Sequence, residues 1–98
     1  MTIKEVIEQL ETASHPVAKA LHKGEHFKIL VLGFRSGMKL KDHEAHLPSK
    51  LTVISGQVIY REGEKELTLN NFDEVDIPVN TKHSVEAIAY SLCLLSQG

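Results

Sequence analysis

The chain of 98 residues carries 11 Lys and Arg against 13 Asp and Glu, a formal net charge of -2, and 42% of its residues are hydrophobic. This length allows one domain, and the composition is that of a globular protein rather than a disordered one. A nucleic-acid-binding surface needs an excess of basic residues and often aromatic side chains on which bases stack. This sequence has no basic excess, and its only aromatic residues of the Phe, Tyr and Trp kind are three Phe and two Tyr. We therefore expect no nucleic-acid partner.

The N-terminal segment predicts a short amphipathic helix. Thr2 and Glu5 have the spacing of a capping box. Apolar side chains then recur at the spacing of one helical stripe: Ile3, Val6, Ile7 and Leu10. Because Pro16 prevents the helix from continuing, we assign residues 1–14 to it. The segment lacks the continuous apolar run of a signal peptide or membrane helix, so we expect a cytoplasmic protein with no membrane partner.

Short β-strands separated by turn signals are predicted for the rest of the chain. The expected strands are 17–22, 26–34, 50–55, 57–61, 66–69, 75–77, 84–89 and 91–95. Two hairpin turns are expected at 23–25 and 62–64, and the charged residues around the second need no functional role. Many short strands at regular spacing are typical of a closed all-β barrel or sandwich. We therefore expect a single domain over residues 1–98, with the barrel over 17–98.

Two segments carry glycine, histidine and proline at a distinctive spacing. The first contains Gly37, His43 and Gly56, and the second contains Pro78 and His83. These segments resemble the two motifs of the cupin superfamily, G-x5-H-x-H-x3-E-x6-G and G-x5-P-x-G-x2-H-x3-N. The resemblance implies an all-β fold, a small jelly-roll β-barrel of the cupin type with a short N-terminal α-helix.

The motif positions that differ from the family pattern matter for function. Ala45 stands where the family has its second histidine, and Ser49 stands where it has glutamate. In the second motif, Phe72 replaces the first glycine and Ala87 replaces the asparagine. Asn80 replaces the turn glycine, which is a mild change because Asn tolerates a positive φ.

The resemblance also implies a histidine-based metal site, and the sequence predicts that this site is incomplete. In metal-binding cupins the motif residues resemble a cage of three histidines and one carboxylate. Here His43 and His46 lie three apart, so on a regular strand they face opposite sides unless a bulge or turn at 45–46 brings both inward. The candidate ligands for an Fe, Mn, Ni or Zn ion are His43, His46 and His83. The alternative is a barrel without metal, in which His43 and His83 bind each other, Ser49 or an organic ligand.

The same strand register predicts the wall of a pocket around the histidines. Its inward-facing residues are Ser49, Leu51, Val53, Val85 and Ala87. The remaining histidines are expected on the surface: His15, His22 and His26. Lys39 and Lys41 are consistent with attraction of an anionic substrate and equally with a solvated edge strand.

Three functions fit these features. The first is a small-molecule-binding barrel without strong catalytic activity, and the second is a metal-dependent enzyme of the dioxygenase or isomerase type. The third is a purely structural dimeric module. Strands 51–54 and 58–60 are apolar on both faces, so we expect the N-terminal helix or a second subunit to cover the outer one, and we predict a homodimer. Cys93 lies in an apolar run and is expected to be a buried small hydrophobe.

Overall fold

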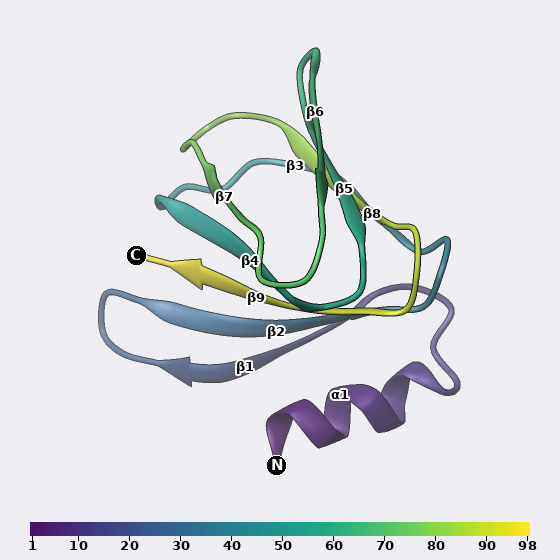
Figure 1. Cartoon of the computed structure of the whole chain (residues 1–98). Coiled ribbons are helices and arrows are strands. Elements are labelled where there is room, and N and C mark those ends of the chain that lie inside the picture. Colours follow the sequence, from purple (N-terminus) through teal and green to yellow (C-terminus); the bar gives the residue numbers. More distant parts are fainter.

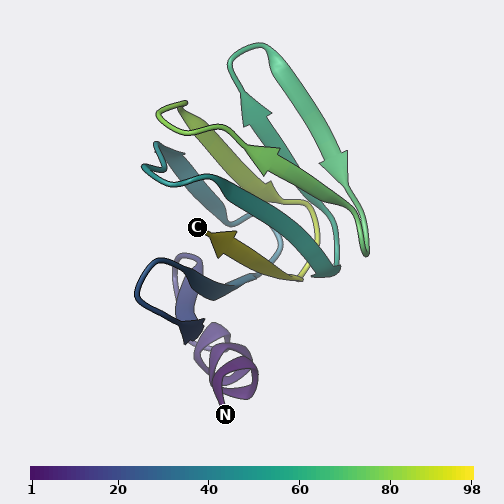
Figure 2. The same cartoon turned by 90° about the vertical axis from the view of Figure 1, so that its left-hand side faces the viewer.

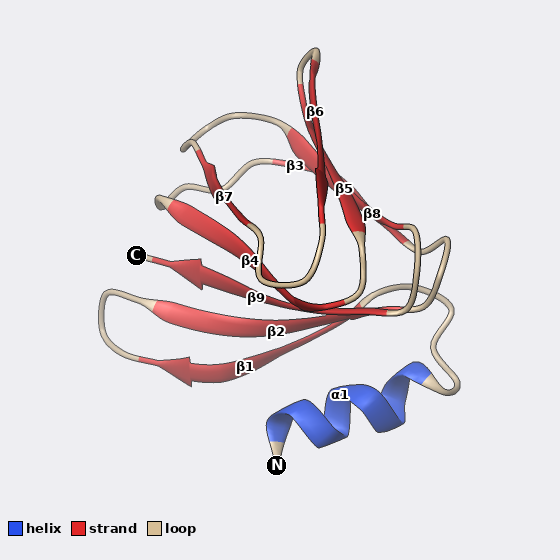
Figure 3. Ribbon diagram, in the orientation of Figure 1, coloured by secondary structure: helices blue, strands red, loops and turns tan.

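The protein folds into one helix and nine strands arranged as two antiparallel sheets (Figures 1 and 3). The computed structural model describes residues 1–98. The elements are α1 Thr2–Leu10, β1 Val17–Lys23, β2 Lys28–Phe34, β3 Lys39–His43, β4 Ser49–Ser55, β5 Val58–Glu62, β6 Lys65–Leu69, β7 Glu74–Ile77, β8 His83–Ala87 and β9 Ser91–Gln97. The first sheet has the strand order β1-β2-β9-β4-β7, and the second has β3-β8-β5-β6. The predicted all-β jelly-roll barrel with a short N-terminal helix is confirmed.

The hydrophobic core lies between the two sheets, which face each other in the two views of Figures 1 and 2. Alternate side chains of the strands point inward, as the period of two in a β-strand requires. The core cluster consists of Leu32, Phe34, Leu51, Val53, Val58, Tyr60, Leu69, Val75, Ile77, Val85, Ala87, Cys93 and Leu95. Cys93 is buried and free, as expected, and burial raises the pKa of its thiol to about 12. Burial of this apolar surface supplies the main driving force for closing the barrel.

The helix α1 covers the outer face of the first sheet at β1 and β2 (Figure 1). Val6 and Leu10 are buried against Val31 of β2. The helix approaches closely because residue 33 is glycine, and a Cβ there would lie 2.6 Å from Val6. Leu10 is the last helical residue because no large apolar side chain follows it on the same stripe, so the helix is shorter than the predicted 1–14.

The predicted capping box at the start of the helix is wrong. The N-cap residue is Met1, and no side chain caps the helix. Thr2 is therefore already inside the first turn, one position too late to act as a cap. The carboxylate of Glu5 instead accepts a 3.1 Å hydrogen bond from Lys19 of β1, which ties the helix to the sheet.

Two details of the strands differ from the sequence-based prediction. The strand β3 was not among the predicted strands, because four of its five residues are Lys, Asp or His. The second hairpin turn is shorter than expected, since β5 continues through Glu62 and β6 begins at Lys65. A two-residue turn remains, in which Gly63 adopts a φ of 59° as tight hairpins require. No helix in the structure is long and apolar enough to span a membrane.

The two positions at which this chain replaces a motif glycine of the family, Phe72 and Asn80, both have left-handed backbone. Asn80 has a φ of 55°, in line with the tolerance expected of Asn. Phe72 has a φ of 71°, which is unfavourable for a residue with a bulky side chain. The Phe72 side chain is 78% exposed, so its packing within the barrel offsets little of this backbone strain.

Candidate functional site at the barrel mouth

A β-bulge in β3 turns His43 into the barrel. Leu40 pairs with Val85 and His43 pairs with His83, so β3 uses one residue more than β8 over this interval. The extra residue changes the alternation of side chains, and Leu40 and His43 both face inward. We call the end of the barrel where β3 ends and β8 begins the barrel mouth. A bulge or turn at 45–46 was the condition for both His43 and His46 to face inward; the observed bulge lies earlier, within β3, and brings only His43 to the mouth.

The imidazole rings of His43 and His83 meet at the barrel mouth. Their centroids lie 4.2 Å apart, and the ring planes are tilted by 55°. The side chain of His83 is buried, at 3% exposure, whereas His43 is exposed. Two residues that are 40 positions apart in the sequence thus lie in contact at the barrel mouth.

Backbone carbonyls set the tautomer of both rings. Nδ1 of His43 lies 2.9 Å from the carbonyl oxygen of Lys41, and Nδ1 of His83 lies 3.1 Å from that of Thr81. A carbonyl oxygen only accepts hydrogen bonds, so each Nδ1 carries the proton and donates it. In the neutral rings, Nε2 is therefore a free acceptor on both histidines.

The Nε2 atom of His83 remains accessible although its residue is buried. Every buried side-chain nitrogen and oxygen in the protein has a hydrogen-bond partner. The only hydrogen bond of the His83 ring is made by Nδ1, so Nε2 must reach solvent at the barrel mouth. The accessible chemistry of the buried ring is thus limited to a single acceptor nitrogen.

Burial lowers the pKa of His83 below the usual imidazole value. The carbonyl of Thr81 opposes this shift by raising the pKa, and the neighbouring His43 lowers it further. The charges of Glu62 and Asp42 also raise it. Since burial is the largest of these effects, His83 is neutral at pH 7 and acts as a hydrogen-bond acceptor.

Tyr60 and Glu62 complete the mouth on the side of β5. The ladder between β5 and β8 pairs Tyr60 with Val85 and Arg61 with Ser84, so the next step brings Glu62 opposite His83. The ring of Tyr60 stacks on that of His83, with centroids 5.9 Å apart and planes at 29°. The hydroxyl of Tyr60 donates a 2.7 Å hydrogen bond to Oε1 of Glu62. Burial is the largest cause that raises the pKa of the Tyr60 hydroxyl, and this hydrogen bond raises the pKa further.

Neither Tyr60 nor Glu62 was among the predicted site residues. Glu62 was assigned to the hairpin turn, where a charged residue needs no functional explanation. The alternation of Val58, Tyr60 and Glu62 is the signal that places all three on the inner face of one strand. That alternation identifies the residues once the strand is known to continue through Glu62.

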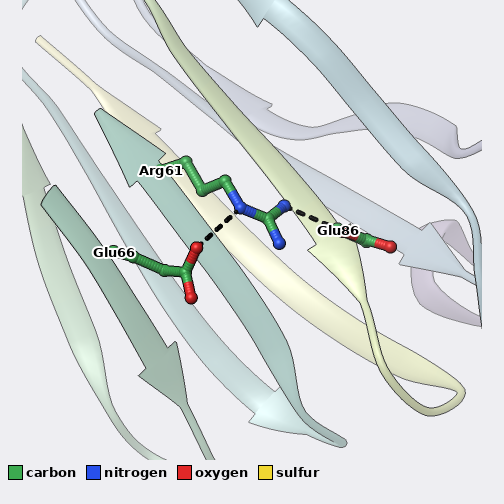
Figure 4. Close-up of polar contacts among 3 residues, drawn as sticks. All are labelled: Arg61, Glu66 and Glu86. Atoms are coloured by element: carbon green, nitrogen blue, oxygen red, sulfur yellow. Dashed lines mark hydrogen bonds and ion pairs between the residues drawn. The ribbon is translucent and has the colours of Figure 1, made fainter. Parts of the chain in front are cut away.

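On the outer face of β5, Arg61 forms ion pairs with the two neighbouring strands (Figure 4). Its Nε donates a 3.0 Å hydrogen bond to Glu66 of β6, and its Nη1 donates a 2.8 Å bond to Glu86 of β8. These bonds raise the pKa of Arg61, and the bond that Arg61 donates to Glu86 has the largest effect. The arginine links three neighbouring strands behind the mouth and is turned away from the histidine pair.

The other predicted ligand positions do not join the histidine pair. His46 lies in an exposed bend after β3. Ala45 is buried and has no ligating side-chain atom. The hydroxyl of Ser49 is occupied, since it donates to the carbonyl of Leu47 at 3.0 Å and accepts from Nε2 of Gln97 at 3.3 Å.

Solved structures of cupins share this arrangement of strands. A cupin superfamily protein from Desulfitobacterium hafniense DCB-2 has a TM-score of 0.80 at 14% identity, covering 86% of this chain and 77% of that chain. A cupin-2 domain containing protein from Shewanella frigidimarina NCIMB 400 has a TM-score of 0.77 at 11% identity, covering 99% and 92%. An RmlC-like cupin family protein from Methanocaldococcus jannaschii, with a double-stranded β-helix fold, has a TM-score of 0.77 at 18% identity, covering 89% and 83%. The chain has the cupin fold. No protein-family model matches the sequence, and no curated protein matches it.

Cupins often bind a metal ion, but the residues at this cupin mouth do not fit one. No group of three or more His, Cys, Asp or Glu side chains is arranged so that it could hold a metal ion. A structural or catalytic metal centre usually needs at least three protein ligands. The cupin barrel is present here, while the donor set of a metal centre is reduced to two imidazoles.

The cupin barrel is filled below the histidine pair. Four of the predicted pocket residues are part of the packed core: Leu51, Val53, Val85 and Ala87. Ser49, the fifth, lines a cavity of about 390 Å³ at the rim of the first sheet, beside Lys28 and Gln97. A second cavity of about 450 Å³ lies next to it, around Phe27. Neither of these two cavities is lined by His43 or His83.

The remaining polar residues considered from the sequence lie apart from the site. His15, His22 and His26 are exposed, in agreement with the surface positions expected for them. Lys39 and Lys41 are exposed on β3. Because β3 pairs only with β8, these two lysines lie on an edge strand of the second sheet.

Proposed function

We propose that this cupin-fold protein binds a small organic molecule at the barrel mouth, through Nε2 of His43 and Nε2 of His83. The observation that carries the proposal is the pair of rings 4.2 Å apart, each with its Nδ1 hydrogen bonded to a backbone carbonyl. Both free nitrogens are held in place by the protein before any ligand arrives. Such preorganised acceptors recognise a ligand at little entropic cost.

The absence of metal-ligating side chains at the other motif positions, Ala45 and Ser49, supports an organic ligand over a bound metal ion. Ala45 supplies no donor atom, and the Ser49 hydroxyl is already hydrogen bonded to Leu47 and Gln97. We propose a binding role rather than a catalytic one, because the mouth offers no nucleophile paired with a general base.

One observation favours the metal-dependent alternative. Histidines that bind metal usually donate their second ring nitrogen to a carbonyl or carboxylate, and both rings do so here. In that case the ligands expected from the sequence, His43, His46 and His83, would hold a divalent ion with water completing its shell, and His46 would have to leave its exposed bend to reach the other two.

Elemental analysis of protein purified without a His-tag separates the two functions. We expect a folded protein without stoichiometric Fe, Mn, Ni or Zn, whose thermal stability rises with a small organic metabolite. The variants His83→Ala and His46→Ala form a matched pair. A bound ion that is lost in both variants would establish the metal-dependent alternative and overturn the binding role proposed here.

We also propose that the protein forms a homodimer. Two residues of the helical stripe stay partly exposed, Ile3 at 43% and Ile7 at 39%, because α1 turns only Val6 and Leu10 toward the sheet. Exposed apolar side chains of this kind favour a protein partner. Size-exclusion chromatography with light scattering at tens of micromolar should give the mass of two chains, and a monomer at this concentration would refute the dimer.

A further inference from the structure

We propose that the ligand of this site is a small cation that donates hydrogen bonds, such as an aliphatic amine or a guanidinium compound. His43, His83 and Glu62 would hold it together. This inference rests on the proposed function and adds the chemical class of the ligand. It follows from which atoms the mouth presents and from the charge they carry.

Three neighbouring strands each contribute one side chain to the site. In the second sheet β3, β8 and β5 are adjacent, and His43 pairs directly with His83. The pairing of β5 with β8 reaches Arg61 and Ser84, so one further step along both strands brings Glu62 opposite His83. Residues directly opposite each other on neighbouring strands have Cβ atoms about 4.5–5.5 Å apart. The row from His43 to Glu62 therefore spans roughly 10 Å, which suits a molecule of a few heavy atoms.

The row presents hydrogen-bond acceptors and no donor. In the neutral rings both Nδ1 protons are committed to the carbonyls of Lys41 and Thr81, which leaves two acceptor nitrogens. A carboxylate is acceptor-only, and the proton of the Tyr60 hydroxyl is already donated to Glu62. A ligand that satisfies all three groups must therefore bring the donors itself.

The charge of Glu62 is left without a partner in the protein. No ion pair involves this carboxylate, although Lys65 lies directly across the hairpin from it. The neighbouring Arg61 is turned to the opposite face of the strand, where Glu66 and Glu86 bind it (Figure 4). Since Asp42 adds a second negative charge near His83, a cation is attracted to this row and an anion is repelled.

Histidine resonances in ¹H–¹³C NMR spectra at about pH 8 test the ligand class with three probes. Agmatine carries an amine and a guanidinium, glutarate is a dianion, and methyl glucoside is a neutral polyol. We expect agmatine alone to shift the ring signals of His43 and His83 in a saturable way. The signals of the distant, exposed His15 should stay unchanged, which serves as an internal control.

Two variants on the same hairpin test the role of Glu62. Glu62→Gln should weaken agmatine binding about tenfold or more, because a charged hydrogen bond is replaced by a neutral one. Glu64→Gln removes an equal charge from the exposed turn and should leave the affinity within about twofold of the wild type. Unchanged affinity in the Glu62→Gln variant would overturn the assignment of Glu62.

The outcomes distinguish this inference from the proposed function. If glutarate or methyl glucoside shifts the His43 and His83 signals and agmatine does not, the ligand class is wrong while small-molecule binding at the mouth stands. If none of the three probes shifts these signals, the inference is overturned. The search for a stabilising metabolite described above then decides separately whether the mouth binds small molecules.

Discussion

The hydroxyl of Tyr60 donates a 2.7 Å hydrogen bond to Glu62, two residues later on the same face of β5. The bond spans the boundary between the core and the barrel mouth, because Tyr60 is fully buried and Glu62 is only half-buried. It satisfies the one polar atom of a large core side chain and also holds a carboxylate beside His83. The packing of the core and the charge of the site are therefore linked through one contact.

This contact predicts a measurable coupling between the two residues. Tyr60→Phe should lower the free energy of unfolding by about 1.5–3 kcal/mol, because hydrogen bonds to charged groups contribute about that much. Urea denaturation of the double variant with Glu62→Gln should show less than the sum of the two single losses. Tyr90→Phe, at a tyrosine that is 44% exposed, should change little. Strict additivity would mean that the bond contributes nothing to stability.

The lowered pKa of His83 predicts a loss of stability in mild acid. The unfolded ring binds a proton near the ordinary imidazole pKa of 6.5, whereas the folded ring resists protonation until a lower pH. Stability from this residue is therefore complete above about pH 6.5 and falls as the pH drops toward the folded pKa. The groups facing the ring are His43, Glu62 and Asp42, and the two acids only reduce the shift.

Urea unfolding at about pH 8 and about pH 5.5 measures this effect. The wild type should lose more stability between these values than His83→Gln, which has no imidazole to protonate at this position. His46→Gln changes an exposed histidine and should keep the wild-type dependence. Equal pH dependence in all three proteins would show that His83 is not responsible.

Backbone strain at Phe72 predicts that glycine is better than alanine at this position. With a φ of 71°, a residue that has a Cβ costs about 1 kcal/mol more than glycine. Phe72→Gly should therefore be more stable than Phe72→Ala, by about 1 kcal/mol, in thermal or urea unfolding. Both variants remove the same exposed ring, so the difference between them reports the backbone alone. An alanine variant of equal or higher stability would refute the strain.

Restoring the two missing motif residues should create a metal site. The double variant Ala45→His with Ser49→Glu adds an imidazole and a carboxylate to His43 and His83, as the cupin pattern has them. We expect one Mn, Ni or Zn ion per chain by elemental analysis in the double variant and none in the wild type. Circular dichroism must show the fold intact. A folded double variant that holds no ion would show that the backbone no longer supports the cage.

Sequence reasoning recovered the fold because cupin motifs are dense in residues with a local physical role. The glycines Gly37 and Gly56 both have positive φ, and Asn80 occupies the turn where a glycine was expected. These positions determine where the strands end. The spacing of these residues within the two motifs then allowed His43 and His83 to be assigned to one site, although they lie far apart in the chain.

The geometry of the site depended on features that leave little trace in sequence. The bulge between Leu40 and His43 lies in a charged segment with no glycine, and without it His43 would share the outward face of Lys39 and Lys41. Glu62 was missed because the sequence Glu62-Gly63-Glu64 resembles a three-residue turn. The turn in fact contains only Gly63 and Glu64, so Glu62 is still part of β5. A one-residue change in a strand boundary moves a side chain from the surface to the site.

The central claim is that two imidazoles at the barrel mouth each offer a free Nε2, and long-range ¹H–¹⁵N correlation spectra at about pH 8 measure this directly. We predict that both His43 and His83 give the pattern of a ring protonated at Nδ1 and bare at Nε2. A pattern with the proton on Nε2 of either ring would contradict the account, because the mouth would then present a donor where two acceptors are required.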